Sequence, residues 1–171
     1  NIDNTVIGVT GTKGKSTTSS LIYAILKQAG KKVHLIGNIG RPMLDEMLKP
    51  IGREDIFVCE FSSYQLDDIK YSPHISVITS LFQEHMNYHG SIDSYFKAKK
   101  NILKFVKLDD YYCYDPDNQI LRQWAEDINC KSLPSKRTIY FDQLANPLIG
   151  EHNLKNIDLA ITTAKIFNIS D

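Results

Sequence analysis

The chain has 171 residues, of which 42% are hydrophobic and 23% charged, and its 20 Lys and Arg residues balance its 20 Asp and Glu residues. A chain of this length buries roughly 70% of its unfolded surface, which suffices for one independent core, so we expect a single compact domain. Zero net charge argues against a protein that wraps nucleic acid or attaches to an anionic membrane, because both need surplus positive charge. No apolar stretch approaches the roughly 20 residues that span a bilayer.

Apolar runs alternate with helical patterns along the chain. Residues 5–10 form a strand-like apolar run, and residues 16–29 follow with apolar side chains at helical spacing, until Gly30 ends the helix. The remaining predicted elements are, in order, a strand at 32–36, a short helix at 41–48, strands at 56–59 and 74–79, a helix at 91–106, a strand at 111–114, a helix at 119–127, a strand at 137–141 and a helix at 151–167.

This alternation predicts an α/β fold with a mostly parallel sheet and helices on both faces. Ligands of such folds bind at the carboxyl ends of the strands, so functional residues are expected in the loops there. The three cysteines are widely separated and lack CxxC spacing, which predicts free thiols in a reducing cytosol rather than disulfides or a zinc site. The first predicted strand begins within a few residues of Asn1, which suggests a domain cut from a longer chain.

A glycine-rich segment at residues 10–17, Thr-Gly-Thr-Lys-Gly-Lys-Ser-Thr, lies between the first strand and its helix. Gly11 and Gly14 allow a tight turn whose N–H groups point at a phosphate, and the start of the helix adds its positive dipole end. Lys15 then offsets the charge of the terminal phosphate, and the Ser16 hydroxyl binds Mg²⁺. The segment predicts a phosphate loop for a nucleoside triphosphate and a P-loop NTPase-like fold.

The loop alone does not fix the reaction, because ATPases, kinases and ligases all share it. Val9 also stands where the strict pattern has its first glycine. Glu60 directly follows the apolar run 56–59 and is predicted to bind magnesium at the same sheet edge. His85 follows another strand but is weak evidence by itself, and Lys99 lies in a lysine-rich stretch whose default explanation is a solvated helix face.

Four blocks in order resemble the central ATPase domain of the Mur ligases of peptidoglycan synthesis. They are residues 8–17, residues 37–40 (Gly-Asn-Ile-Gly), residues 60–66 (Glu-Phe-Ser-Ser-Tyr-Gln-Leu), and residues 150–153 (Gly-Glu-His-Asn) with Asn156. The resemblance covers essentially the whole chain, and the loop of this family regularly lacks the first glycine, which accounts for Val9. The second and third blocks look most like the branch of the family that adds D-glutamate.

The resemblance implies a role for each matching residue. The ATP phosphates are expected at Gly11, Thr12, Lys13, Gly14, Lys15, Ser16 and Thr17, the adenine at Asn153 and Asn156, the magnesium ions at Ser16, Glu60 and His85, and the UDP-muramoyl substrate at Asn38, Ser62 and Gln65. Lys99 occupies the position at which family members carry a carbamylated lysine that ligates magnesium, although Lys100 is one residue away. Lys15, Glu60, His85 and Lys99 are accordingly the expected catalytic residues.

The implied reaction uses ATP and Mg²⁺ to join D-glutamate to UDP-N-acetylmuramoyl-L-alanine through an acyl phosphate. Residues 1–171 would be only the middle of three domains, in a bacterial, cytoplasmic and monomeric enzyme, and the isolated chain is expected not to ligate. Two departures from the family pattern are Glu84 in place of Asp and Ser80 in place of Asn, while Lys13 stands at a variable position often occupied by Asn. The alternatives are a folylpolyglutamate synthetase-like ligase and a P-loop NTPase module without ligase chemistry.

Overall fold

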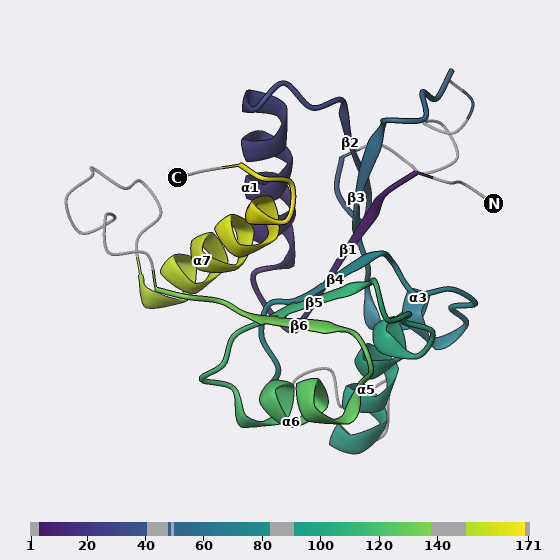
Figure 1. Ribbon diagram of the computed structural model, residues 1–171. Coiled ribbons are helices and arrows are strands. Elements are labelled where there is room, and N and C mark those ends of the chain that lie inside the picture. The colour runs from purple at the N-terminus through teal and green to yellow at the C-terminus, as the bar shows by residue number, and fades with distance from the viewer. Residues whose placement is uncertain (1–3, 41–47, 49, 83–90, 138–149, 170–171) are drawn as a thin grey trace.

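The computed structural model describes residues 4–40, 48, 50–82, 91–137 and 150–169 and shows one six-stranded sheet (Figure 1). All strand pairs are parallel, and the spatial order is β2-β3-β1-β4-β5-β6. The strands are β1 Val6–Thr10, β2 Val33–Gly37, β3 Ile56–Glu60, β4 Ile75–Ile78, β5 Tyr111–Tyr114 and β6 Lys131–Pro134. This confirms the predicted α/β fold with a parallel sheet.

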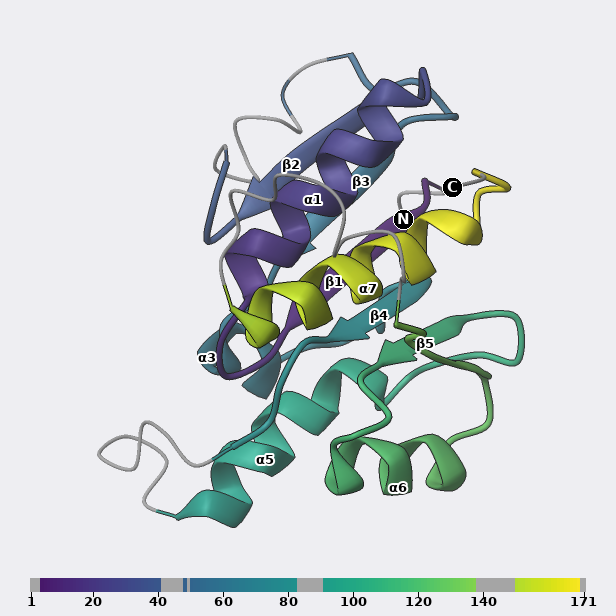
Figure 2. The same ribbon diagram turned by 90° about the vertical axis from the view of Figure 1, so that its left-hand side faces the viewer.

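Helices cover both faces of the sheet, as predicted. On one face lie α1 (Lys15–Gln28) and α7 (Glu151–Lys165), which pack against each other. The other face carries α3 (Ser63–Asp67), α5 (Ile92–Lys100), the 3₁₀ turn η1 (Asn101–Leu103) and α6 (Gln119–Asp127). In Figure 2, α1 and α7 lie in front of the strands, and α5 and α6 lie below β4 and β5.

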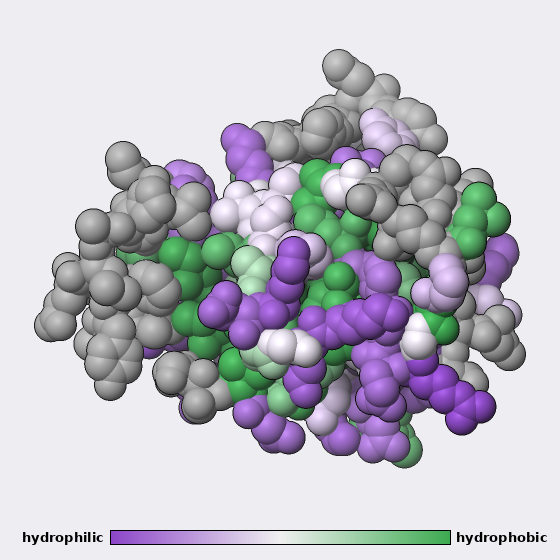
Figure 3. All heavy atoms as spheres, turned by 90° about the horizontal axis from the view of Figure 1, so that it is seen from above, coloured by the Kyte–Doolittle hydropathy of each residue, from purple (hydrophilic) through white to green (hydrophobic). Residues whose placement is uncertain are grey.

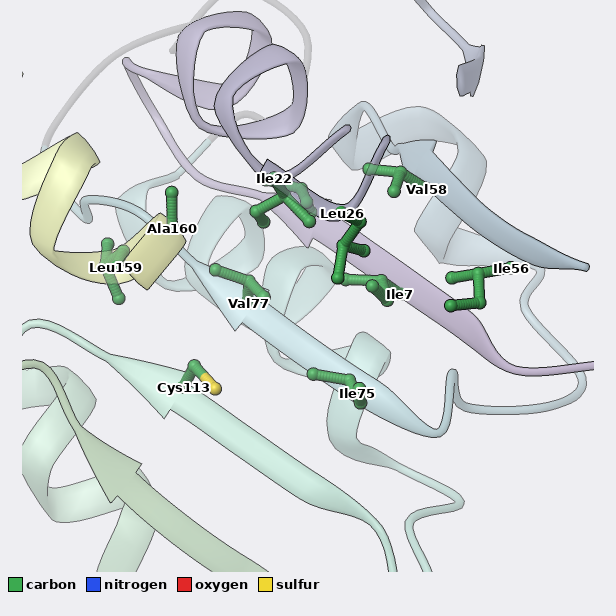
Figure 4. Close-up of a cluster of buried hydrophobic side chains, with 11 residues drawn as sticks. Ile7, Ile22, Leu26, Ile56, Val58, Ile75, Val77, Cys113, Leu159 and Ala160 are labelled. Carbon is green, nitrogen blue, oxygen red and sulfur yellow. The ribbon is translucent and has the colours of Figure 1, made fainter. Parts of the chain in front are cut away.

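The buried cores explain why these segments pair as they do. In Figure 4, Ile22 and Leu26 of α1 and Leu159 and Ala160 of α7 point onto the central strands. Their partners on the sheet are Ile7, Val58 and Val77 with Ile56, Ile75 and Cys113. A second core under α3, η1 and α6 contains Leu66, Ile102, Tyr112, Leu121 and Trp124. Because both faces are buried, the central strands are almost continuously apolar.

Three elements differ from the sequence prediction. The helix expected at 91–106 ends at Lys100 and tightens into η1, because the Phe105 N–H donates to Ser72 Oγ (2.9 Å) instead of continuing the helix. Helix α3 and strand β6 were not predicted. The predicted helix at 41–48 and strand at 137–141 lie almost wholly outside the described residues; Arg137, which is described, is not in a strand.

The cysteines are free thiols, as expected. Burial raises the pKa of Cys59 and of Cys113 to about 12, and it raises the pKa of Cys130 to about 11. At neutral pH these thiols are therefore protonated and poorly nucleophilic. No helix among the described residues combines the length and the apolar character that crossing a bilayer requires. On the face shown in Figure 3, hydrophilic and hydrophobic residues are interspersed rather than separated into broad zones.

Asp55 organises the amino-terminal edge of the sheet, opposite to the strand ends that carry the predicted site. Its carboxylate is 2% exposed and accepts hydrogen bonds from Lys32 Nζ and His34 Nε2, both at 2.9 Å. Burial pushes the pKa of the Asp55 carboxyl upward, but the hydrogen bonds from Lys32, His34 and Gly52 outweigh burial and hold that pKa below its usual range. The ionised carboxylate therefore stabilises the fold.

We expect Asp55→Asn to lower the free energy of unfolding at pH 7 by about 2 kcal/mol, because a buried charge interaction is removed. A carboxyl with a lowered folded pKa contributes stability above its unfolded pKa, near 3.8, and loses it as the pH falls through the folded value. The difference between wild type and variant should therefore shrink below about pH 4. Urea unfolding at pH 7 and pH 3 measures both quantities.

The matched control is Asp109→Asn, which removes the exposed pair between Asp109 and Lys131. Exposed pairs contribute little, so this variant should unfold like the wild type at both pH values. An Asp55→Asn variant with the wild-type urea midpoint at pH 7 would contradict the assignment.

Candidate functional site

The predicted phosphate loop lies between β1 and α1, at the carboxyl edge of the sheet (Figure 1). Strand β1 has β3 on one side and β4 on the other, with Val9 beside Glu60 and Thr10 beside Ile78. The strands β1 and β4 are neighbours, but the connections that leave them run in opposite directions. After β1 the chain crosses to β2 at one edge of the sheet, and after β4 it continues to β5 on the other side. This is a topological switch point, where parallel sheets open a crevice for ligands. The fold thus brings Glu60 and the residues after β4 to the loop.

Two glycines with positive φ shape the loop, Gly11 at 149° and Gly14 at 85°. Gly14 is the N-cap of α1 and supplies no side-chain hydrogen bond, so the first-turn N–H groups have no cap from it. The first N–H groups of a helix lack intrahelical partners and carry its positive dipole end. Gly14 to Thr17 therefore present a binding site for an anion such as a phosphate.

The chain after β4 forms hydrogen bonds with the first half of the loop. The Thr12 N–H donates to Ser80 O (2.8 Å), and the Lys13 N–H donates to Ser80 Oγ (2.9 Å). Ser80 Oγ and Thr79 Oγ1 donate in turn to Lys13 O, at 2.9 and 2.6 Å. The serine that departs from the family pattern thus fastens the loop. Because the amides of Thr12 and Lys13 already have partners, the amides that suit a phosphate are those from Gly14 onward.

Three lysines surround the loop in different ways. Lys15 Nζ donates to Gly11 O and Thr12 O, each at 3.1 Å, and Lys99 Nζ donates to the same Gly11 O at 2.8 Å. The two ammonium groups are therefore neighbours. Lys13 is exposed, and its Nζ lies 5.5 Å from the centre of the Phe82 ring. Lys15 and Lys99 thus place two positive charges at the loop, and Lys13 offers a third from its rim.

The two adjacent lysines of α5 have opposite environments. The Lys99 side chain is 2% exposed and reaches the phosphate loop, with its Nζ 4.7 Å from the centre of the Tyr95 ring. Lys100 is part-exposed and points elsewhere, forming an ion pair with Asp127 at 3.1 Å and lying over Trp124. The geometry therefore favours Lys99 over Lys100 as the residue that acts at the loop.

Glu60 ends β3 beside the loop, with 3% of its surface exposed. Its Oε2 atom has no hydrogen-bond partner among the described residues. A buried, unpartnered carboxylate oxygen is costly unless a cation or water satisfies it, so this atom fits a hard cation such as Mg²⁺. Within the described ranges, no three His, Cys, Asp or Glu side chains converge.

The structure describes the position of only one of the two other predicted magnesium ligands, Ser16 and His85. Ser16 is exposed in the first turn of α1, where its hydroxyl can meet a phosphate-bound ion, and Thr17 is half-buried beside it. His85 lies outside the described residues, as does Glu84. The structure therefore brings Ser16, Glu60 and Lys99 to one sheet edge, while His85 stays a prediction.

The residues predicted to face the muramoyl substrate lie past β2 and β3. Asn38 is exposed just after β2, and its N–H donates to Glu60 O (3.2 Å). Ser62 and Gln65 form a capping box at the start of α3: the Gln65 N–H donates to Ser62 Oγ (3.3 Å), and the Ser62 N–H donates to Gln65 Oε1 (2.8 Å). These two side chains therefore have a structural use in addition to any contact with substrate.

Helix α7 brings the predicted adenine residues to the loop. A Cβ on Gly14 would lie 2.2 Å from Asn156 Oδ1, so Asn156 lies directly against the loop, and its Nδ2 donates to Asn153 Oδ1 (3.3 Å). One residue away, Lys155 pairs with Asp115 and Asp117 of the β5–α6 loop, each at 2.9 Å. Hydrogen bonds to Asp117 and Asp115 raise the pKa of Lys155 to about 12.

A pocket of about 300 Å³ opens beside that ion pair, between the ends of β5 and β6 and the start of α7. It is lined by Asp115, Asp117, Ser135, Arg137, Glu151, Leu154, Lys155 and Asp158 with Pro116. Sequence reasoning did not find this pocket, because its charged residues come from three separate segments.

Sequence reasoning also missed Thr79, Ser80 and Tyr95 as residues that hold the loop. A local signal for the first two existed, because polar residues directly follow the apolar run of β4. Their contact with the loop depends on β4 being the strand beside β1, which the order of strands along the chain does not reveal. Tyr95 belongs to the Tyr-x-x-Ala-Lys pattern by which Lys99 resembles the carbamylated lysine of the family, but that resemblance gave Tyr95 no role at the loop.

Comparison with known proteins identifies related chains. The family described as Mur ligase middle domain matches residues 9–146. A UDP-N-acetylmuramoylalanine–D-glutamate ligase from Geobacillus sp. (strain WCH70) is 34% identical, over 96% of this chain and 41% of that protein. The chain therefore spans less than half the length of this relative.

Two solved structures share the fold. MurF ligase from Thermotoga maritima, in complex with ADP, matches 98% of this chain and 46% of its own with a TM-score of 0.77 at 20% identity. FolC from E. coli, in complex with DHPP and ADP, matches 97% of this chain and 54% of its own with a TM-score of 0.64 at 14% identity. At such identities the likeness concerns the fold alone.

Proposed function

The chain belongs to the Mur ligase family, whose middle domain it matches, and from this premise we propose that it is the ATP-binding domain of a D-glutamate-adding ligase. One observation carries the proposal: Lys15 and Lys99 both donate to the phosphate loop, and Glu60, whose buried Oε2 has no hydrogen-bond partner among the described residues, ends the strand next to the loop. The loop and its lysines suit a polyphosphate, and the buried carboxylate oxygen suits its magnesium ion.

Each residue then has a defined task. The N–H groups of Gly14 to Thr17 bind phosphate oxygens, and Lys15 exchanges its contacts with Gly11 O and Thr12 O for the terminal phosphate. Asn153 and Asn156 face the adenine from α7. Ser16 and Glu60, together with the predicted His85, would hold magnesium. When bound, Mg²⁺ offsets the negative charge that develops as two anions are brought together.

Lys99 is proposed to act as a carbamate. CO₂ adds to the neutral amine with loss of a proton, which replaces a cation with an anion on a long side chain. An anion at this buried position, beside Lys15 and the phosphate loop, would ligate magnesium instead of repelling it. The same exchange at Lys100 would remove the ion pair with Asp127 and place the carbamate at an exposed site away from the loop.

The proposed reaction has two steps. The carboxylate of UDP-N-acetylmuramoyl-L-alanine attacks the γ-phosphorus of ATP, so that an acyl phosphate forms and ADP leaves. The amine of D-glutamate then attacks the acyl carbon, phosphate leaves, and the amide forms with loss of a proton. Asn38, Ser62 and Gln65 lie past the ends of β2 and β3 and would position the muramoyl substrate.

Further domains before and after this segment would bind the uridine end of the substrate and the amino acid. The proposal includes such flanking domains, a monomeric enzyme and a location in the bacterial cytoplasm. The chain by itself is then expected to bind ATP weakly and to form no amide. Incubation with ATP, Mg²⁺, UDP-N-acetylmuramoyl-L-alanine and D-glutamate tests this, and steady amide production by the isolated chain would contradict it.

Two alternatives make different predictions. A folylpolyglutamate synthetase-like ligase shares the fold, but the residues after Glu60, Phe-Ser-Ser-Tyr-Gln-Leu, and the D-glutamate ligase relative favour the muramoyl substrate. A nucleotide-binding module without ligase chemistry would bind ATP equally well. Binding of UDP-N-acetylmuramoyl-L-alanine and not of a folate would argue against the folylpolyglutamate synthetase-like ligase. A Lys99 carbamate signal after incubation with ¹³C-bicarbonate would argue against a module without ligase chemistry.

We expect Glu60→Gln to abolish most of the gain in ATP affinity that Mg²⁺ provides, about tenfold, because an amide at this position places an N–H₂ group where the cation needs an oxygen. Affinity without Mg²⁺ should change by less than about twofold. Calorimetric titration with ATP, with and without Mg²⁺, measures both values. Equal losses in the two titrations would show that Glu60 supports the loop and does not serve the metal.

A further inference from the structure

All polar groups of Thr12 are engaged inside the protein. The N–H donates to Ser80 O (2.8 Å), and the carbonyl accepts from Lys15 Nζ (3.1 Å). The hydroxyl donates to Phe82 O (3.1 Å) and accepts from the Phe82 N–H and the Tyr95 hydroxyl, both at 3.2 Å. A hydroxyl offers one donor and two acceptor positions, so that of Thr12 is saturated. A saturated and buried hydroxyl does not suit a direct ligand for phosphate or metal.

The hydroxyl of Thr12 joins the loop to the helix that carries Lys99. Tyr95 and Lys99 are one turn apart on α5, and both are buried. Tyr95 reaches Thr12, Lys99 reaches Gly11 O (2.8 Å), and the Lys99 ammonium lies over the Tyr95 ring. Because residues at i and i+4 share a helix face, these two bonds fix the rotation of α5 relative to the loop.

The same hydroxyl fixes the chain after β4. It bonds both the N–H and the carbonyl of Phe82, which holds the backbone there in one orientation. Phe82 is the last described residue before the segment that contains the predicted ligand His85. One side chain therefore holds Phe82 and the helix that carries Lys99 together.

We propose that Thr12 is a positioning residue that holds Phe82, after β4, and the helix that carries Lys99 in fixed positions relative to the phosphate loop. This inference rests on the proposed function, because it assigns Thr12 to the magnesium-dependent part of nucleotide binding. The resemblance to the family placed Thr12 among the phosphate ligands; its contacts in the structure direct it towards Phe82 and Tyr95 instead.

The test compares Thr12→Val, which removes the hydroxyl at nearly constant shape, with Thr12→Ser, which keeps it. Thr18→Val is the matched control, because the buried Thr18 Oγ1 has no hydrogen-bond partner among the described residues. One readout is the hydrogen-exchange rate of the Phe82 amide without nucleotide. The other is ATP affinity with and without Mg²⁺.

For Thr12→Val we expect Phe82 amide exchange to accelerate about tenfold and the Mg²⁺-dependent gain in ATP affinity to fall about tenfold, because partners of one hydroxyl lose their hydrogen bonds. Affinity without Mg²⁺ should change by less than about twofold. Thr12→Ser should restore both readouts, and Thr18→Val should match the wild type. Wild-type values for Thr12→Val, or a Thr12→Ser as impaired as Thr12→Val, would overturn the inference.

If Thr12→Val does not fold, the Tyr95→Phe variant tests the inference instead. It removes one of the three hydrogen bonds of the Thr12 hydroxyl and keeps the aromatic ring under the Lys99 ammonium. A reduced Mg²⁺-dependent gain with unchanged Mg²⁺-free affinity supports the inference, and an unchanged gain contradicts it. A wild-type chain that binds no ATP at all would remove the proposed function. The Phe82 exchange rates would still decide whether the Thr12 hydroxyl positions this segment.

Discussion

Replacement of Lys15 by alanine should weaken ATP binding about 100-fold, because the cation proposed to make charge-assisted contacts with the terminal phosphate is lost. Lys15 is half-buried, and its present partners, Gly11 O and Thr12 O, hold its ammonium group over the loop. Calorimetric titration of wild type and variant with ATP and Mg²⁺ gives the ratio of dissociation constants.

Lys13→Ala is the matched control for this prediction. Lys13 carries the same charge on the same loop but is exposed and lies over Phe82, so its removal should cost only about threefold. Similar losses for the two variants would mean that the loop attracts nucleotide by overall charge and that Lys15 has no special contact.

A methyl group at Gly11 should both destabilise the fold and eliminate nucleotide binding. Gly11 has a φ of 149°, and a Cβ there would lie 2.1 Å from Thr79 Oγ1 and 3.0 Å from the Ser80 N atom. Since the Ser80 contact is with backbone of the chain after β4, the clash cannot be relieved by rotating a side chain. We expect Gly11→Ala to lower the free energy of unfolding by about 3 kcal/mol.

Gly30→Ala separates backbone strain from crowding. Gly30 also has a positive φ, 76°, but a Cβ there would meet nothing within 4 Å. This variant should cost about 1 kcal/mol from strain alone and leave ATP binding intact. Urea unfolding and ATP titration of both variants provide the measurements, and equal destabilisation by the two would refute the steric part of the prediction.

Local sequence signals were sufficient wherever one segment determined its own structure. Continuous apolar runs gave β1, β3 and β4, and helical spacing gave α1 and α7. The start of α3 was missed although Ser62-Ser63-Tyr64-Gln65 matches the capping-box pattern, because these residues were assigned to substrate by resemblance. Strand β6, Lys131–Pro134, has one strongly apolar residue and a proline, so its strand state depends on pairing with β5.

The candidate site likewise has parts that local sequence signals predicted and parts that depend on tertiary contacts. The sequence alone predicted the phosphate loop, because Gly11, Gly14, Lys15 and Ser16 lie close together in the chain and their spacing encodes the turn and the start of α1. It also placed Glu60 at a strand end. Resemblance to the family favoured Lys99 over Lys100, but helical spacing alone did not choose between them, since neighbouring helical residues differ only in the direction in which they point.

Only the tertiary structure decided which residues meet across the loop. Thr12 lies 83 residues from Tyr95 and 70 from Phe82, and Gly11 lies 88 from Lys99, so no local pattern links these pairs. Their contacts arise because β4 pairs with β1 and α5 packs beneath that edge of the sheet. Composition indicated a neutral domain, the alternation of apolar runs and helical patterns predicted its α/β fold, and one motif predicted its phosphate loop. Packing of distant segments decided which lysine and which threonine contact that loop.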